Sequence, residues 1–90
     1  MAEYLLELYI SRGDPTTVAD AAQRARAAAG EVSAEGSSVR YVRAIFVPED
    51  ETCFCLYEAD SVETVREAAQ RAALPFERIT EAFTETRDTK

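Results

Sequence analysis

Four segments of the chain alternate apolar and polar residues, or concentrate β-branched and aromatic ones, as β-strands do. They are residues 3–10, 39–47, 52–59 and 78–85. The first segment places Tyr4, Leu6, Leu8 and Ile10 on one face, and the second and third are joined by the acidic turn PEDE. The pattern therefore predicts an N-terminal strand, a central hairpin and a C-terminal strand.

Between the first and second strands, residues 16–29 have the apolar spacing of an amphipathic helix. Asp14 is placed to cap this helix, and Pro15 suits its first position. We expect Gly30 to end the helix and residues 31–38 to form a loop. The buried stripe is almost entirely alanine, so the helix should pack closely but bury little area; its members are Val18, Ala21, Ala22, Ala25 and Ala29.

A second helix is predicted after Asp60, which can cap it, with Glu63 three residues further on. Leu74 and Pro75 should end it. Its expected apolar stripe consists of Val62, Val65, Ala69 and Ala72. The element order is then βαββαβ, which predicts an α+β, ferredoxin-like fold with a four-stranded antiparallel sheet and two helices on one face. Residues 1–90 form one such domain, and residues 85–90 are a polar tail.

The chain also resembles itself, since TVADAAQRA at residues 17–25 matches TVREAAQRA at residues 64–72. Extending this match to the preceding strands, with a gap of one residue, aligns Leu6 and Leu8 with Phe54 and Leu56. It also aligns Leu5, Glu7 and Tyr9 with Cys53, Cys55 and Tyr57. We expect the first set to face the helices and the second set to line the helix-free face of the sheet.

Such a helix-free face would be too apolar to remain in water, and we expect it to pack against the same face of a second copy, as a homodimer. Its expected apolar members are Leu5, Tyr9, Cys53, Cys55 and Tyr57, joined by Tyr41 and Ile45. Glu7 is the charged residue of this face, and Arg43 is expected on the same face, where it could form an ion pair with Glu7. The alternative is a site in which Glu7, with Cys53 or Cys55, holds a metal or a small ligand between the sheets.

Composition and charge narrow the possible partners. Seventeen acidic and ten basic residues give a net charge of −7, which disfavours nucleic acid and anionic membranes as partners. The chain has no run of about 20 apolar residues and no signal-peptide pattern at its start, so we expect a cytoplasmic protein. It contains two cysteines and no histidine. Free cysteine is more often a small buried hydrophobe than a ligand, and a lone C-x-C is a weak metal signal.

Residues 41–79 resemble a family of small bacterial ferredoxin-like proteins of unknown function that has a nickel-binding member. The likeness rests on the PEDE turn, the strand FCLYEA, the helix TVREAAQRAALP and the closing ERI. It implies a dimer whose sheets face each other in a barrel-like arrangement, and divalent transition-metal binding. Cys55 and Glu58 match the family motif, but this chain has Ala69 and Ala73 where the family typically has histidine and glycine.

Three classes of function follow from these observations. The first is a small dimeric protein that binds a ligand, with a nickel-like metal implied by the family resemblance; the second is a non-catalytic interaction module. The third is a cofactor-free enzyme of the dimeric α/β-barrel kind, with Glu7 as base and Tyr9 or Tyr57 as donors. The absence of histidine disfavours the enzyme. The candidate ligand-binding residues are Glu7, Tyr9, Tyr41, Arg43, Cys55 and Tyr57, and the candidate metal ligands are Cys53, Cys55, Glu7 and Glu58.

Overall fold

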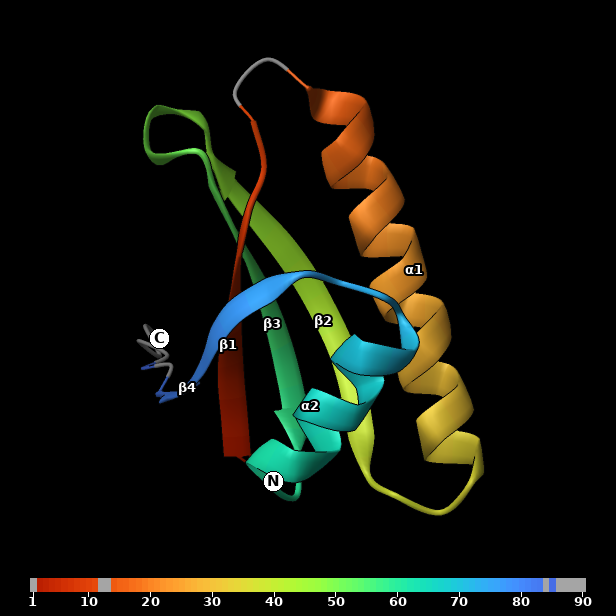
Figure 1. Ribbon diagram of the computed structural model, residues 1–90. Helices are drawn as coiled ribbons and strands as arrows, with labels where there is room; N and C mark the ends of the chain where they lie inside the picture. The colour runs from red at the N-terminus through yellow and green to blue at the C-terminus, as the bar shows by residue number, and fades with distance from the viewer. Residues whose placement is uncertain (1, 12–13, 84, 86–90) are drawn as a thin grey trace, which may run out of the picture.

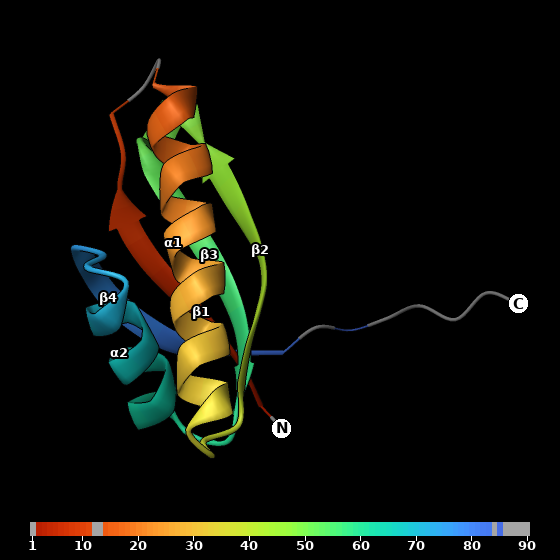
Figure 2. The same ribbon diagram turned by 90° about the vertical axis from the view of Figure 1, so that its right-hand side faces the viewer.

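The computed structural model describes residues 2–11, 14–83 and 85 of the chain. Its elements are β1 (Ala2–Tyr9), α1 (Pro15–Ala34), β2 (Val39–Val47), the 3₁₀ turn η1 (Pro48–Asp50), β3 (Thr52–Ala59), α2 (Val62–Arg71) and β4 (Phe76–Ala82). The four strands form one antiparallel sheet in the order β2-β3-β1-β4. Both helices lie on the same face of this sheet (Figures 1 and 2). The predicted α+β, ferredoxin-like βαββαβ architecture is confirmed.

Helix α1 is longer than the sequence pattern predicts. Asp14 caps its start as expected, because its side chain accepts a hydrogen bond from the Thr17 backbone N–H at 3.3 Å. The helix then continues through Gly30 to Ala34, whereas we expected it to end at Gly30. Val32 explains the extra turn, since it is only 1% exposed and anchors this end of the helix in the core.

Helix α2 begins one residue later than predicted, and the cap is a different residue. Ser61, not Asp60, is the N-cap, and its hydroxyl accepts from the Thr64 backbone N–H at 3.3 Å. The Asp60 backbone N–H instead donates to the Ser38 carbonyl at 3.2 Å, which holds Asp60 in the connection beside the α1–β2 loop.

Strands β2 and β3 have the predicted bounds, while β4 spans Phe76–Ala82 instead of residues 78–85. Residues 86–90 of the predicted polar tail, and Thr84, lie outside the described part of the chain.

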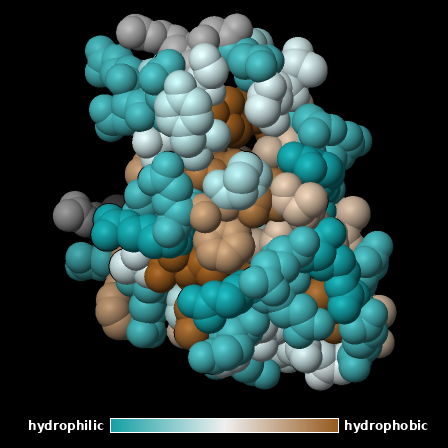
Figure 3. All heavy atoms as spheres, in the orientation of Figure 1, coloured by the Kyte–Doolittle hydropathy of each residue, from teal (hydrophilic) through white to brown (hydrophobic). Residues whose placement is uncertain are grey.

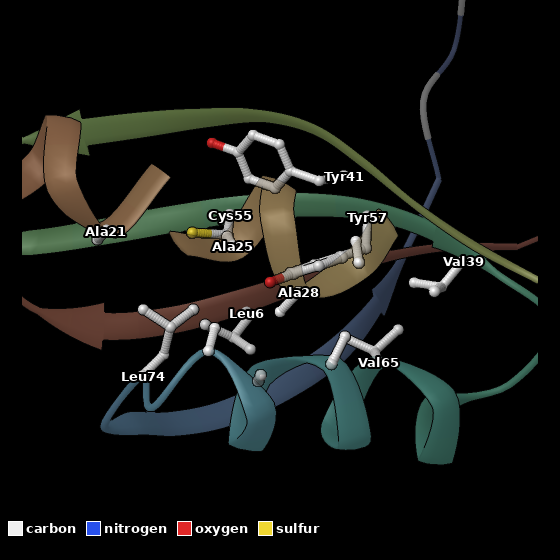
Figure 4. Packing of buried hydrophobic residues seen from close by; sticks show 14 of the residues in the cluster. Leu6, Ala21, Ala25, Ala28, Val39, Tyr41, Cys55, Tyr57, Val65 and Leu74 are labelled. Atoms are coloured by element: carbon white, nitrogen blue, oxygen red, sulfur yellow. The ribbon is translucent and has the colours of Figure 1, made fainter. Parts of the chain in front are cut away.

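The hydrophobic core lies between the sheet and the helices and is thin. Helix α1 contributes mostly alanines to it, and its buried residues are Ala21, Ala25, Ala28, Ala29 and Val32. Larger side chains come from the sheet, where Leu6 and Tyr57 are fully buried (Figure 4). In the view of Figure 3, apolar side chains remain visible across the middle of the molecule between polar regions above and below.

The prediction that Cys53, Cys55 and Tyr57 lie on the helix-free face is wrong. Leu6 pairs with Cys55 across the β1–β3 ladder, and all three predicted residues are fully buried beneath the helices. Residues directly opposite each other in an antiparallel pair share a face. A shift of one residue moves every side chain of a strand to the other face, and the one-residue gap inserted into the internal repeat made that shift.

Tyr41 was also assigned to the wrong face, for a separate reason. A bulge in β2 between Tyr41 and Arg43 changes the alternation of the strand. Tyr41 therefore points into the core, opposite Tyr57, while Arg43 and Ile45 lie on the helix-free face as predicted.

The two helices end in the same hydrogen-bonded C-terminal motif, but with different residues in the left-handed position. After α1 this residue is Gly36, with φ of 111°, and after α2 it is Ala73, with φ of 58°. The Ala73 N–H donates to the Gln70 carbonyl and the Leu74 N–H donates to the Ala69 carbonyl, which is the Schellman pattern. Only glycine adopts this conformation without a steric cost at Cβ.

We therefore predict that Ala73→Gly raises the free energy of unfolding by about 1 kcal/mol, because it removes a left-handed residue with a side chain. Denaturant unfolding at fixed protein concentration measures this change. Gly36→Ala is the matched control and should lower the unfolding free energy by a similar amount. A destabilised Ala73→Gly variant would contradict this account of the α2 end.

Candidate functional site

The helix-free face of the sheet carries both apolar and charged side chains. Its central apolar residues are Leu5, Phe54 and Leu56, which remain half-buried, and Tyr9 and Ile45 are more open, with exposed fractions of 56% and 46%. Its charged residues are Glu3, Glu7, Arg40, Arg43, Glu58 and Arg78. Leu5, Glu7, Tyr9, Arg43 and Ile45 lie on this face, as expected from the strand pattern.

Glu7 forms an ion pair with Arg78 and not with Arg43. The Arg78 Nε lies 2.6 Å from a Glu7 carboxylate oxygen, and these residues are neighbours in the β1–β4 register. Arg43 pairs with Leu56 on β3, which separates β2 from β1. Sequence reasoning missed Arg78, although the expected strand order already makes β4 the second neighbour of β1.

Two further contacts fix polar groups at the margins of this face. The Tyr9 hydroxyl donates to a Glu51 carboxylate oxygen at 3.3 Å. The Arg40 guanidinium donates to Glu58, with a shortest distance of 2.8 Å. Burial alternates along β3, so Glu58 lies on the opposite face from the buried Cys55, and the two cannot bind one ion together.

The remaining candidate residues meet inside the core. The Tyr41 and Tyr57 rings make an edge-to-face contact with centroids 5.7 Å apart. Burial is the main cause that raises the pKa of Tyr41 to about 12, and it raises the pKa of Tyr57 as well. The hydrogen bond with Cys53, together with burial, raises the pKa of the Cys55 thiol. Cys53, Cys55 and Tyr57 are closed to solvent and do not form a ligand-binding surface, whereas Tyr41 keeps a small exposed area beside α1.

The described residues do not fit a transition-metal site. Across residues 2–11, 14–83 and 85, no three histidine, cysteine, aspartate or glutamate side chains converge on a position that could hold a metal ion. The chain has no imidazole, and both cysteines are buried. Ala69 is fully buried on the core side of α2. The predicted metal ligands Cys53, Cys55, Glu7 and Glu58 are therefore divided between the two faces of the sheet.

The Tyr57 hydroxyl is buried and has no hydrogen-bond partner among the described residues. An unsatisfied buried hydroxyl costs roughly 1–3 kcal/mol. We predict that Tyr57→Phe leaves the free energy of unfolding unchanged or raises it by about 1 kcal/mol, as measured by denaturant unfolding. Tyr57→Ala, which also removes the ring, should lower it by about 3–5 kcal/mol. A clear loss in Tyr57→Phe would mean that a buried water bonds this hydroxyl.

The two thiols should be inert in the folded protein because both are fully buried. The hydrogen bond between them lowers the pKa of Cys53 and raises the pKa of Cys55, but a reagent in solution reaches neither sulfur. We predict that a thiol-specific reagent at neutral pH modifies them only when the protein unfolds, so that the rate increases with denaturant. Ser37→Cys, in the exposed α1–β2 loop, supplies an accessible control thiol. Equal rates for the native cysteines and this control would contradict the buried placement.

Comparison with known proteins identifies relatives by sequence and by fold. The model of a family described as "Nickel responsive protein SCO4226-like" matches residues 4–82. The crystal structure of SCO4226 from Streptomyces coelicolor A3(2) superposes with a TM-score of 0.71 at 22% identity, covering 94% of this chain and 100% of that one. This structural likeness supports the fold. No curated protein matches the chain significantly. No helix in the described ranges is long and apolar enough to cross a membrane.

Proposed function

This chain belongs to the SCO4226-like family of nickel responsive proteins, and we propose that it acts as a homodimeric protein that binds a small ligand between two facing sheets. The observation that supports this proposal is the helix-free face. Its apolar centre of Leu5, Phe54 and Leu56 is only half-buried in the single chain. An apolar patch of this kind, with a polar margin, is typical of a protein–protein interface.

The size of the core supports the same proposal. A chain of 90 residues buries a smaller fraction of its unfolded surface than a larger domain does, and here the main helix contributes mainly alanine methyl groups. Burying the helix-free face of two copies against each other would add hydrophobic stabilisation of about 25 cal/mol per Å². Dimerisation would then supply part of the stability that the thin core does not.

Between two such faces, the polar groups available to a ligand are the Glu7–Arg78 pair, Arg43 and the Tyr9 hydroxyl. Arg43 is exposed and makes no ion pair within the described part of the chain. In Glu7–Arg78 the carboxylate side chain is 22% exposed and the guanidinium 71% exposed. These groups suit hydrogen bonding to a small polar ligand.

Catalysis and nickel binding have less support. A catalytic Glu7 would require a carboxylate isolated from cations in an apolar site, whereas Glu7 is already paired with Arg78. Nickel is the ligand to which the family name points, but the donor groups described above do not converge in this chain. We therefore propose that this protein binds a small ligand, and that this ligand is not nickel.

The dimer proposal predicts that the purified protein has the mass of two chains by size-exclusion chromatography with light scattering. Leu56→Lys should shift it to the mass of one chain while the far-UV circular dichroism stays native, because a charge would be buried in the interface. Gln70→Lys adds the same charge on the exposed surface of α2 and should leave the dimer intact.

Two outcomes would contradict this proposal. A wild-type protein that is monomeric at low micromolar concentration would exclude the dimer. A dimer that Leu56→Lys does not weaken would place the interface elsewhere.

Thermal-shift measurements with Ni²⁺ should show no stabilisation beyond that seen with Mg²⁺. A stabilisation specific to nickel would contradict our interpretation of the candidate metal ligands.

A further inference from the structure

A cavity lies between α1 and β2, which is an edge strand of the sheet. Figure 2 shows the C-terminal half of α1 alongside the start of β2. The cavity has a volume of about 510 Å³, within the usual range for small-molecule sites. Arg26, Ala29, Gly30 and Ser33 of α1 form one wall, and residues 38–41 form the other.

The polar groups of this cavity are hydrogen-bond donors, and no carboxylate lines it. The Arg26 guanidinium lies 5.1 Å from the centroid of the Tyr41 ring. In the part of the chain that the structure describes, Arg26 makes no ion pair, and the hydroxyls of Ser33 and Ser38 have no protein partner. Arg40 differs, because its guanidinium is bonded to Glu58 on the other face of the sheet.

Gly30 provides an independent indication that this space is used. It lies within α1, where glycine is the least favourable residue after proline. A Cβ built at this position would meet no atom within 4 Å, and the backbone does not have a positive φ. Neither packing nor backbone conformation therefore requires glycine here. Gly30 forms part of the cavity wall, so a side chain at this position would reduce the space in the cavity.

From these features we infer that the cavity binds a small organic anion. Its carboxylate or phosphate group accepts hydrogen bonds from Arg26 and from the hydroxyls of Ser33 and Ser38. Its apolar body lies against Val39 and Tyr41, which form the buried floor. The net negative charge of the chain does not prevent this, because charges farther away than about 8 Å are largely screened at physiological salt.

This site is separate from the proposed ligand position between two sheets. The cavity lies beside the helix that covers the opposite face, and all the groups that form it belong to one chain. Its occupancy therefore does not depend on dimerisation. Light scattering on the same samples reports the oligomeric state independently of any binding result.

The test is a titration of the isotope-labelled protein, followed by ¹H–¹⁵N correlation spectra, with phenyl phosphate, benzoate and neutral benzamide. Both anions should shift the amide signals of Gly30, Ser33 and residues 38–41 at millimolar concentration or below, and benzamide should not. The stronger of the two anions identifies whether phosphate or carboxylate is the preferred group. Equal binding of benzamide, or no localised shifts with either anion, would overturn the proposal.

Two pairs of variants test which residues carry the binding. Arg26→Gln should raise the Kd roughly 10–100-fold, because it removes a charge-assisted hydrogen bond. Arg24→Gln removes the same charge from the same helix, where Arg24 pairs with Asp20, and should change the Kd little. An equal loss in both variants would indicate non-specific charge attraction and would refute the site.

Gly30→Ala should raise the melting temperature by roughly 4–8 °C, because alanine is the better helix residue, and should weaken anion binding. Gly30→Leu should weaken the binding further, since its larger side chain would occupy part of the cavity. A stabilised variant that binds less tightly separates loss of the site from loss of the fold. Undiminished binding in Gly30→Leu would place the anion elsewhere.

Discussion

The contact between the alanine-lined face of α1 and the sheet determines how the rest of this protein is built. Methyl groups at Ala21, Ala25 and Ala28 let the helix approach the sheet closely, so the sheet supplies the large side chains. Tyr57 is the largest fully buried side chain, and its hydroxyl is enclosed without a partner. Beside it, the small thiols of Cys53 and Cys55 occupy strand positions beneath the helices. A shallow core thus explains why cysteine and tyrosine are internal here.

The same constraint leaves apolar residues for the other side of the sheet. Strand β3 carries Phe54 and Leu56 on the face that the helices do not cover, and β1 carries Leu5 beside them. The ion pairs on this face involve partly exposed side chains, and such pairs contribute only about 0–1 kcal/mol each. They keep the face soluble and give it polar contacts, but they do not replace the burial that its apolar centre lacks.

The sequence pattern predicted the elements of this fold better than the faces of its strands. Both hairpin strands have the bounds expected from their composition. The segment TCFCLYEA, however, is apolar on both faces, so its alternation does not show which set points inward. The bulge after Tyr41 changes which residues of β2 face the core, and a strictly alternating pattern cannot show such a change. Helix ends depended on tertiary contacts, since Val32 prolonged α1 beyond a glycine that would otherwise end it.

The candidate site was recovered in part for the same reason. Glu7, Tyr9 and Arg43 lie on the predicted face because their strand parities were assigned correctly, whereas the cysteines followed the misplaced repeat. Arg78 and the α1–β2 cavity were missed because both follow from the neighbours that each strand and helix has in the folded chain. Such neighbours become visible only after the topology is applied to individual side chains.

The arginines of this acidic protein also explain why the paired carboxylates in its described part do not create a cation site. Glu31 of α1, Glu35 just after α1 and Glu67 of α2 surround Arg71, at distances of 3.8, 2.7 and 3.2 Å. The hydrogen bond from Arg71 lowers the pKa of Glu35. Glu7 and Glu58 are likewise bonded to Arg78 and Arg40. A metal ion at any of these positions would have to displace a guanidinium, and no imidazole is available to compensate for that loss.

Arg26, in contrast, contacts an aromatic ring and keeps its hydrogen-bond donors available, which directs the chemistry of this chain toward anions.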